Sequence, residues 1–320
     1  MKLSRRALTI MTALGLSVLA GCGSGKKDDR IVLGFSQIGA ESEWRTANTE
    51  SIKSAAVTMN IDLRFADAQQ KQENQIKAIR SFIAQKVDVI AFSPVVETGW
   101  DTVLQEAKAA KIPVILTDRS VTSDPSLFVG LIGSDFTEEG RKAGRWVLDK
   151  YKATTGDVNI VELQGTVGAA PAIDRKKGFE EIVGANPRFK IIRSQSAEFT
   201  RAKGKEVMEA FLKAETRKID VLFAHNDDMA IGAIQAIEEA GKRPGQDILI
   251  VSIDGVKGAF EAMIAGKLNV TIECNPLLGP QLMTSVVEVY AGHPIPRRTV
   301  VNEQVFPMET ARQHIQSRQY

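Results

Sequence analysis

The sequence has few of the residues that cross-link small domains or mark common catalytic sites. Only two cysteines occur among 320 residues, so a disulfide scaffold is excluded. The three histidines are scattered along the chain, and neither a His-Glu-x-x-His nor a Cys-x-x-Cys spacing marks a metal site. A Gly-x-Ser-x-Gly elbow and a Walker-type phosphate loop are also missing, which disfavours α/β-hydrolases and P-loop enzymes. We therefore expect a protein that is not an enzyme and that holds no metal and no cofactor.

An excess of charge of either sign is missing as well. Lys and Arg number 41 against 39 Asp and Glu, which gives a formal net charge of +2, so nucleic acid is not an expected partner. Hydrophobic residues make up 43% of the chain, enough for ordinary buried cores. The length suits about two domains.

The chain begins with the pattern of an export signal. Lys2, Arg5 and Arg6 precede a charge-free run at 7–20, which is too short for an ordinary transmembrane helix and fits a secretory signal. The run ends in Leu19-Ala20-Gly21-Cys22, and small residues before a cysteine resemble the bacterial lipobox. This resemblance implies cleavage before Cys22 and a lipid on its thiol.

We accordingly predict a lipoprotein signal peptide at 1–21 and a polar tether at 22–29. Losing the signal peptide removes three basic residues and no acidic residue, so the net charge changes from +2 to −1. The mature protein is expected outside the cytoplasm, in the periplasm or at the cell surface, anchored to a membrane by its lipid. The Ser4-Arg5-Arg6 start leaves both general and twin-arginine export open.

Apolar runs alternate with amphipathic segments through the rest of the chain. This alternation predicts an α/β protein with parallel sheets that are covered on both faces. About ten strands are too many for one simple doubly wound domain, so two sheets are expected. The predicted strands are 31–36, 61–66, 87–93, 112–117, 127–132, 158–163, 189–194, 221–224, 248–253, 270–273 and 300–306. The predicted helices include 45–59, 72–85, 102–110, 138–151, 172–183, 204–214 and 230–240.

Polar residues gather directly after several predicted strands. Asp118 and Arg119 follow one strand, Asn226 follows a second, and Asp254 follows a third. Ligands of open α/β sheets bind beyond the carboxyl ends of the strands. Each of these residues could instead cap a helix, but Asp118 and Asp254 at equivalent strand ends favour contact with a ligand.

The residue types suit a polyol. Sugars present many hydroxyls and one apolar ring face, so their sites combine carboxylate and amide acceptors, guanidinium donors and an aromatic ring. Arg119, Arg175 and Arg45 are candidate donors. Trp44, in the polar loop that follows the first strand, is the one candidate for stacking on the ring.

Six segments resemble the type I periplasmic sugar-binding proteins, the solute receptors of ABC importers, and among these the galactofuranose-binding receptors most of all. The resemblance spans about residues 31–306. The segments are 34–39 (GFSQIG), 68–78 (AQQKQENQIKA), 162–168 (ELQGTVG), 173–179 (IDRKKGF), 191–196 (IIRSQS) and 224–229 (AHNDDM).

The resemblance implies two Rossmann-like lobes joined by a three-stranded hinge, with crossings near Asp135, Cys274 and Phe306. The N-terminal lobe is then 30–134 plus 275–305, and the C-terminal lobe is 135–274 plus 306–320. The lobes close on a monosaccharide, and the closed receptor delivers it to the permease and ATPase subunits of the importer. A monomer is expected.

The resemblance also implies the site. The binding residues that it carries over are Glu41, Ser42, Glu43, Trp44, Arg45, Asp118, Arg119, Arg175, Asn226 and Asp254. Two positions depart from the pattern of relatives. Glu43 stands where galactofuranose receptors have Gly, and Cys274 stands where pyranose-binding relatives place a Gln.

A hexofuranose, galactofuranose first, is the expected ligand. A site with a single aromatic ring suits a small furanose, whereas a flat pyranose is better suited to a sandwich of two aromatic rings. Two alternatives keep the same residues. A secreted glycoside-processing enzyme could use Asp118 and Asp254, although Arg119 beside Asp118 favours a carboxylate over a proton donor there. A lipoprotein of this fold could also present a sugar to a signalling partner.

Cys22→Ser is expected to abolish lipid attachment and cleavage at this site, because the thiol is the acceptor of the lipid. Mass spectrometry of the mature N-terminus measures this. A wild-type chain that keeps residues 1–21 and an unmodified Cys22 would contradict the prediction.

Overall fold

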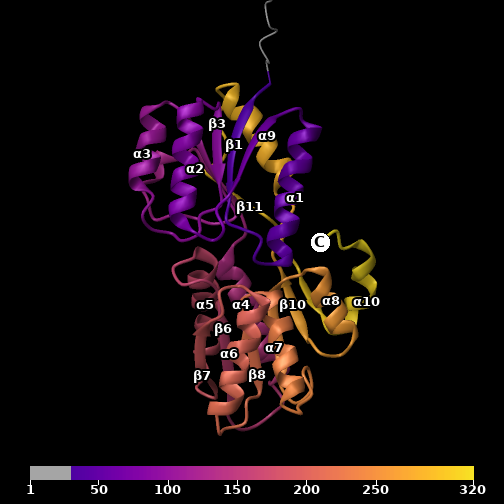
Figure 1. Ribbon diagram of the computed structural model, residues 1–320. Helices are drawn as coiled ribbons and strands as arrows, with labels where there is room; N and C mark the ends of the chain where they lie inside the picture. The colour runs from indigo at the N-terminus through magenta and orange to yellow at the C-terminus, as the bar shows by residue number, and fades with distance from the viewer. Residues whose placement is uncertain (1–29) are drawn as a thin grey trace, which may run out of the picture.

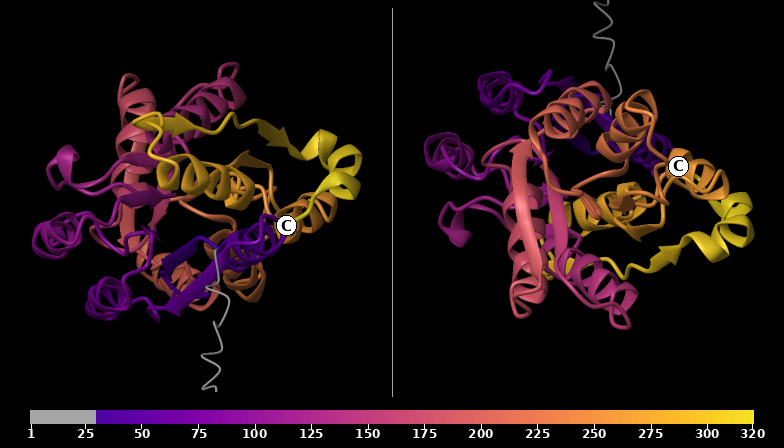
Figure 2. Two further views of the ribbon diagram at one scale, coloured as in Figure 1. Left: turned by 90° about the horizontal axis from the view of Figure 1, so that it is seen from above. Right: turned by 90° about the horizontal axis from the view of Figure 1, so that it is seen from below.

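The computed structural model describes residues 30–320, which form two α/β lobes, one above the other (Figure 1). The predicted signal peptide, the tether and Cys22 lie outside the described residues. Views from above and below show helices on both sides of the strands (Figure 2). The two parallel-sheet lobes confirm the predicted fold class.

The upper, N-terminal lobe is built on a six-stranded sheet in the order β11-β5-β4-β3-β1-β2. Its strands are β1 (Val32–Gln37), β2 (Asp62–Asp67), β3 (Val89–Phe92), β4 (Val114–Thr117), β5 (Gly130–Gly133) and β11 (Arg298–Val300). Its helices are α1 (Glu43–Thr58), α2 (Gln72–Gln85), α3 (Asp101–Ala109) and α9 (Gly279–Tyr290), with a 3₁₀ turn η1 (Pro125–Leu127). The helices α1 and α9 bury one apolar cluster against the sheet, and α2 and α3 bury another.

The lower, C-terminal lobe repeats this plan with the order β12-β10-β9-β8-β6-β7. Its strands are β6 (Val158–Gln164), β7 (Phe189–Ser196), β8 (Val221–Ala224), β9 (Leu249–Asp254), β10 (Val270–Glu273) and β12 (Val305–Pro307). Its helices are α4 (Phe136–Lys150), α5 (Ala170–Val183), α6 (Arg201–Ala214), α7 (Asp227–Glu239), α8 (Lys257–Ile264) and α10 (Ala311–His314), with 3₁₀ turns η2 (Met308–Thr310) and η3 (Ile315–Ser317). One edge strand, β12, runs antiparallel to β10.

The chain passes between the sheets three times. The first passage, 134–135, joins β5 to α4; the second, 274–278, joins β10 to α9; the third, 301–304, joins β11 to β12. The expectation of one strand over 300–306 is therefore wrong. The polar residues 302–304 separate two short strands that belong to different sheets.

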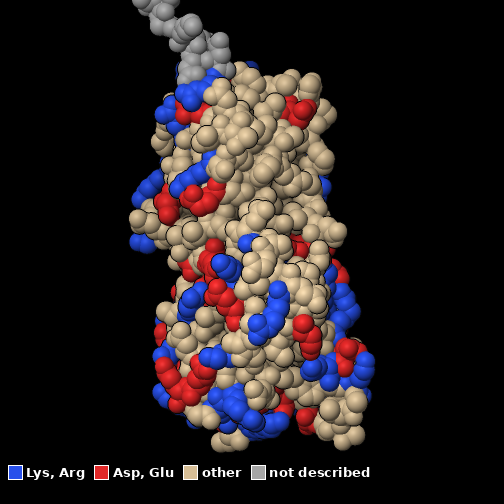
Figure 3. All heavy atoms as spheres, turned by 90° about the vertical axis from the view of Figure 1, so that its right-hand side faces the viewer, with Lys and Arg blue, Asp and Glu red and all other residues tan. Residues whose placement is uncertain are grey.

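Charged side chains of both signs are interspersed over the C-terminal lobe on the face that Figure 3 shows. Within residues 30–320, no helix is both long enough and apolar enough to span a membrane.

Close helix crossings hold the C-terminal lobe together. Gly140 of α4 and Gly178 of α5 let the two helix backbones touch, because a Cβ at Gly178 would lie 1.9 Å from the carbonyl oxygen of Thr137. A Cβ at Gly140 would lie 2.2 Å from the carbonyl oxygen of Arg175. Since Arg175 is a predicted binding residue, this crossing also sets the distance of its backbone from α4.

Gly178→Ala is expected to lower the free energy of unfolding, although alanine is the better helix former by about 1 kcal/mol. Forcing a methyl group against a backbone carbonyl should cost about 1–3 kcal/mol, as overpacking does in cores. Chemical denaturation measures the change. The exposed helical substitution Ser54→Ala is the control, and a Gly178→Ala protein as stable as this control would contradict the prediction.

Candidate ligand-binding site

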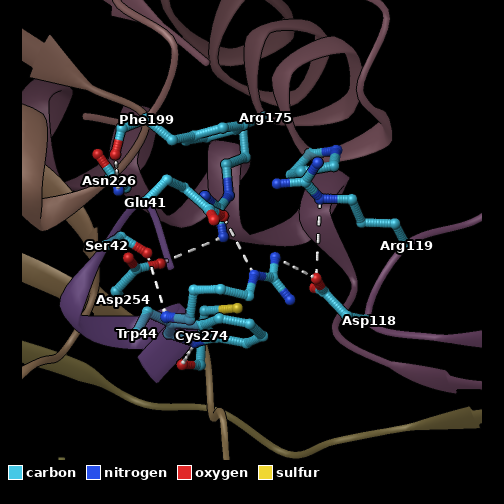
Figure 4. Close-up of a pocket in the computed structure, with 12 residues that line it drawn as sticks. Glu41, Ser42, Trp44, Asp118, Arg119, Arg175, Phe199, Asn226, Asp254 and Cys274 are labelled. Atoms are coloured by element: carbon cyan, nitrogen blue, oxygen red, sulfur yellow. Dashed lines mark hydrogen bonds and ion pairs between the residues drawn. The ribbon is translucent and has the colours of Figure 1, made fainter. Parts of the chain in front are cut away.

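A small, narrow cavity lies between the lobes, at the carboxyl ends of the strands. Nine of the ten predicted binding residues line it, and Glu43 does not. Figure 4 shows the lining residues pointing toward one another from both lobes. The lining consists of Glu41, Ser42, Trp44, Arg45, Asp118, Arg119, Pro171, Arg175, Phe199, Asn226, Asp254 and Cys274.

An ion pair between Arg45 and Asp118 forms the wall on the side of the N-terminal lobe. The Nη2 of Arg45 donates to Oδ2 of Asp118 at 2.7 Å, and its Nε donates to Oε1 of Glu41 at 3.1 Å. The same Asp118 oxygen accepts from Ser93 Oγ at 2.9 Å. Burial opposes the charge on Asp118, but Arg45 and Arg119 outweigh it and hold the pKa of this carboxyl below its usual value. Asp118 is therefore an ionised acceptor.

Two strand ends carry backbone strain. Asp118, directly after β4, has φ +61°, and Asp254, the last residue of β9, has φ +132°. Side-chain-bearing residues rarely adopt positive φ, and such residues cluster at functional sites. The two aspartates thus occupy equivalent positions in the two lobes, as their placement after strands predicted.

Arg119 has guanidinium donors left over for a ligand. Its Nη1 donates to the carbonyl oxygen of Val95 at 3.0 Å, and its guanidinium lies 5.2 Å from the ring centroid of Phe199 in the other lobe. Burial, with Arg45 nearby, lowers the pKa of Arg119 to about 10, which leaves it charged at neutral pH. Its Nε is buried and lies 3.7 Å from Oδ2 of Asp118, an ion-pair distance, but it makes no hydrogen bond within the described residues.

Arg175 enters the cavity from α5 of the C-terminal lobe. Its Nε donates to Oε2 of Glu139 at 2.7 Å, its Nη1 donates to the carbonyl oxygen of His225, and its Nη2 lies 3.6 Å from Oδ1 of Asp254. Although burial opposes its charge, Glu139 and Asp254 raise the pKa of Arg175. Burial raises the pKa of Asp254 well above its usual value, and the nearby Asp227 and Glu139 add to this, so the opposing effect of Arg175 does not outweigh them.

Trp44 and Cys274 meet at the base of the cavity. The indole Nε1 of Trp44 donates to the carbonyl oxygen of Cys274 at 2.6 Å, which ties α1 to the second passage between the lobes. The guanidinium of Arg45 lies 4.6 Å from the centroid of the Trp44 ring. Cys274 is buried, and this burial raises the pKa of its thiol. Stacking of a sugar on Trp44 stays a prediction.

The loop residue Phe199 is the main lining residue that sequence reasoning missed. It follows β7, has φ +61°, and lies so close to Gly165 that a Cβ there would be 1.9 Å from its ring. Asn226 holds it, because the amide of Asn226 donates to the Phe199 carbonyl oxygen at 3.1 Å while its Oδ1 caps α7. The expectation of a single aromatic at the site is therefore wrong. The sequence signal that could have identified Phe199 is an aromatic residue three positions after a strand and close to the start of a helix.

Glu43 lies at the rim, where the lobes touch. Its backbone N–H donates to Oδ2 of Asp228 at 2.8 Å, and its carboxylate lies 3.7 Å from Arg201. Burial, with Asp228 nearby, raises the pKa of Glu43. Its neighbour Ser42 both lines the cavity and caps α1 by accepting from the Arg45 N–H at 3.1 Å.

Two buried polar atoms of the N-terminal lobe's cavity wall have no hydrogen-bond partner within residues 30–320, namely Oε2 of Glu41 and Nε of Arg119. One accepts and the other donates. Buried polar atoms are almost always paired, so these two call for a ligand that offers both donors and acceptors.

Known proteins of this architecture include close relatives. A periplasmic binding protein domain matches residues 33–292. The galactofuranose-binding protein YtfQ of Escherichia coli is 48% identical, and the match covers 90% of this chain and 91% of that protein. A Mycobacterium smegmatis protein in complex with β-D-fucofuranose is 58% identical, with a TM-score of 0.89 over 91% of this chain and 95% of that one.

A third relative is the binding protein of the arabinose ABC transporter from Shewanella sp. ANA-3, bound to α- and β-L-arabinofuranose. It is 53% identical, with a TM-score of 0.87 over 90% of this chain and 95% of that one. These likenesses confirm the resemblance that the six sequence segments indicated.

Asp118→Asn is expected to lower the free energy of unfolding by about 3–5 kcal/mol, because it removes the carboxylate beside Arg119 and leaves Arg45 with Glu41 alone. The carboxylate's contribution is present at neutral pH and is lost as the pH falls below the usual Asp range, since its pKa is lowered in the folded chain. Denaturation without sugar measures this. The control is Glu106→Gln, which removes the exposed partner of Arg80 and should change stability little; equal effects would contradict the prediction.

Proposed function

This chain belongs to the periplasmic binding protein family, and from that membership we propose that it is an extracytoplasmic receptor that binds a monosaccharide in furanose form. The observation that carries the proposal is the buried, charged cavity between the lobes, whose wall holds one acceptor and one donor that lack hydrogen bonds within the described residues. Hydroxyl groups both donate and accept, so a sugar can satisfy both atoms. It would then be delivered to the permease of an ABC importer.

The division of the site between lobes supports a closing mechanism. Asp118, Arg119 and Arg45 come from the N-terminal lobe, and Arg175 and Asp254 come from the C-terminal lobe. A ligand that contacts both sets binds the closed form more tightly and shifts the hinge equilibrium toward it.

In the closed arrangement the two lobes also contact each other directly at two places. The backbone N–H of Glu43 donates to the carboxylate of Asp228, and the N–H of Glu97 donates to the carbonyl oxygen of Gly168 at 2.9 Å. The closed surface, continuous across both lobes, is what a permease would recognise.

The furanose assignment rests on the relatives, of which one binds galactofuranose, one holds fucofuranose and one holds arabinofuranose. The aromatic residues of the site do not add support for a furanose, because Phe199 provides a second ring beside Trp44. Galactofuranose remains the first candidate.

We propose binding without chemical conversion. A glycosidase needs one protonated and one ionised carboxyl at the bond to be cleaved. The raised pKa of Asp254 beside ionised Asp118 formally offers such a pair. The relatives are binding proteins, however, and sugar hydroxyls donating to Asp254 would favour its carboxylate form. Hydrolysis of an aryl galactofuranoside is therefore assayed as a control, and turnover would overturn this part of the proposal.

The proposed receptor acts outside the cytoplasm. The family implies export, and a lipid on Cys22 would keep the receptor beside its importer at the membrane surface. Delivery to an ABC permease is favoured over presentation to a signalling partner, because an arabinose ABC transporter supplies one of the close relatives.

Calorimetric titration is expected to show binding of methyl galactofuranoside and of L-arabinose, and weaker binding of D-glucose and D-ribose. Bulk galactose should bind with an affinity reduced by its small furanose fraction. Arg119→Lys should weaken binding about ten- to a hundredfold, because an ammonium cannot replace the planar fork.

The matched control is Arg80→Lys on the exposed face of α2, which should leave the affinity unchanged. Tight binding of glucose or ribose, with none of the furanose sugars, would refute the ligand assignment. An Arg119→Lys protein with wild-type affinity would remove Arg119 from the site.

A further inference from the structure

A buried cluster of acidic side chains lies next to the cavity, where the three passages between the lobes come together. Glu303, in the third passage, accepts from the Ser134 hydroxyl of the first passage and from the Asn275 N–H of the second at 3.1 Å. One carboxyl group thus joins all three passages. The contacts lie at the passages about which the lobes would rotate.

Glu303 also faces Glu139 of α4. The carboxyl oxygens of Glu139 and Glu303 and the sulfur of Cys274 lie within 4.8 Å of one another, and all three residues are buried. Two carboxylates this close in a buried site cannot both stay ionised. Arg175 already neutralises the charge of Glu139. The cluster therefore needs one proton to neutralise the charge of Glu303.

The geometry indicates where that proton lies. The Oε2 of Glu139 accepts from Arg175, whereas its Oε1 has no donor among the hydrogen bonds of residues 30–320. A proton on Glu303 supplies the missing donor. Burial, reinforced by the negative charge of Glu139, raises the pKa of Glu303 to about 9, which agrees with a protonated group at neutral pH.

We propose that Glu139 and Glu303 form one proton-sharing carboxyl pair, which positions Arg175 for the ligand and holds the three passages in the closed arrangement. Both are positioning residues, because they act on the ligand through Arg175 and the hinge. The proposal rests on the proposed sugar-receptor function.

The pair makes closure depend on pH. The closed form takes up a proton at Glu303, provided that opening separates the two carboxyls. Affinity for sugar is then greatest at low pH and falls as the pH rises toward about 9. The other titratable or charged groups that face the pair are Lys142 of α4, Arg175 of α5, Asp254 of β9, Cys274 of the second passage and Arg298 of β11.

The experiment measures the affinity of the full mature chain for L-arabinose between pH 6 and 9.5, in the wild type and in E303Q. The wild-type affinity should fall by about tenfold or more over this range, since one linked proton changes affinity by up to tenfold per pH unit. E303Q keeps a neutral donor toward Glu139 and should show an affinity ratio between pH 6 and 9.5 near one. E139Q should bind weakly at every pH, because Arg175 loses its carboxylate.

The matched control is E273Q. Glu273 is a buried glutamate at the end of β10, but it faces Arg318 and Tyr320 instead of another carboxylate. E273Q should keep the wild-type pH dependence. A wild-type affinity that does not change with pH, or equal slopes in the wild type and E303Q, would overturn the proposal.

Infrared difference spectra of the proteins saturated with L-arabinose test the proton directly, because the sugar holds the lobes in the closed form. At pH 7, the wild type should show a protonated carboxyl band that E303Q lacks. Absence of this difference would overturn the shared proton even in a receptor that binds sugar normally. Failure of the wild type to bind any sugar at any pH would instead overturn the proposed function.

Discussion

Buried guanidinium groups held against carboxylates are the interaction on which the cavity depends. Arg45 pairs with Asp118 in one lobe, and Arg175 pairs with Glu139 in the other. Buried ion pairs add little net stability, since desolvation offsets their attraction. Their value here is geometric, because they hold charged groups in fixed positions around a cavity from which a ligand excludes water.

The two lobes use their pairs differently. In the N-terminal lobe, Asp118 pairs with both Arg45 and Arg119, and the Nε of Arg119 makes no hydrogen bond among the described residues. In the C-terminal lobe, Arg175 connects the cavity to the hinge through Glu139. A ligand that displaces Arg175 even slightly therefore also displaces the cluster that joins the three passages. Ligand contact and lobe closure are physically linked by this one side chain.

Ionised and protonated carboxyl groups lie in different parts of the molecule. Asp118 has two arginines beside it and stays ionised, whereas Glu303 has another carboxyl beside it and holds a proton. The difference arises from neighbouring charges, since all of these groups are buried. The site therefore offers Asp118 to the sugar as an ionised acceptor, whereas the proton on Glu303 lies at the hinge.

Much of this arrangement followed from local sequence. Apolar runs and amphipathic segments mark most strands and helices, because burial on both faces needs near-continuous apolar strands. Asp118 and Asp254 were predicted for the site because strand ends of a parallel sheet meet at one edge. The segment 300–306 misled the prediction, since each half pairs with a strand from a different lobe.

The sequence by itself determined the two α/β lobes, the export pattern and most of the residues that line the cavity. Only the tertiary structure decided that Phe199 forms part of the wall, that Glu43 turns to the rim, and that Glu303 meets Glu139 at the hinge. The physical reason is distance along the chain. Glu303 and Glu139 are brought together by passages that no local pattern encodes, and the charge state of each depends on the other.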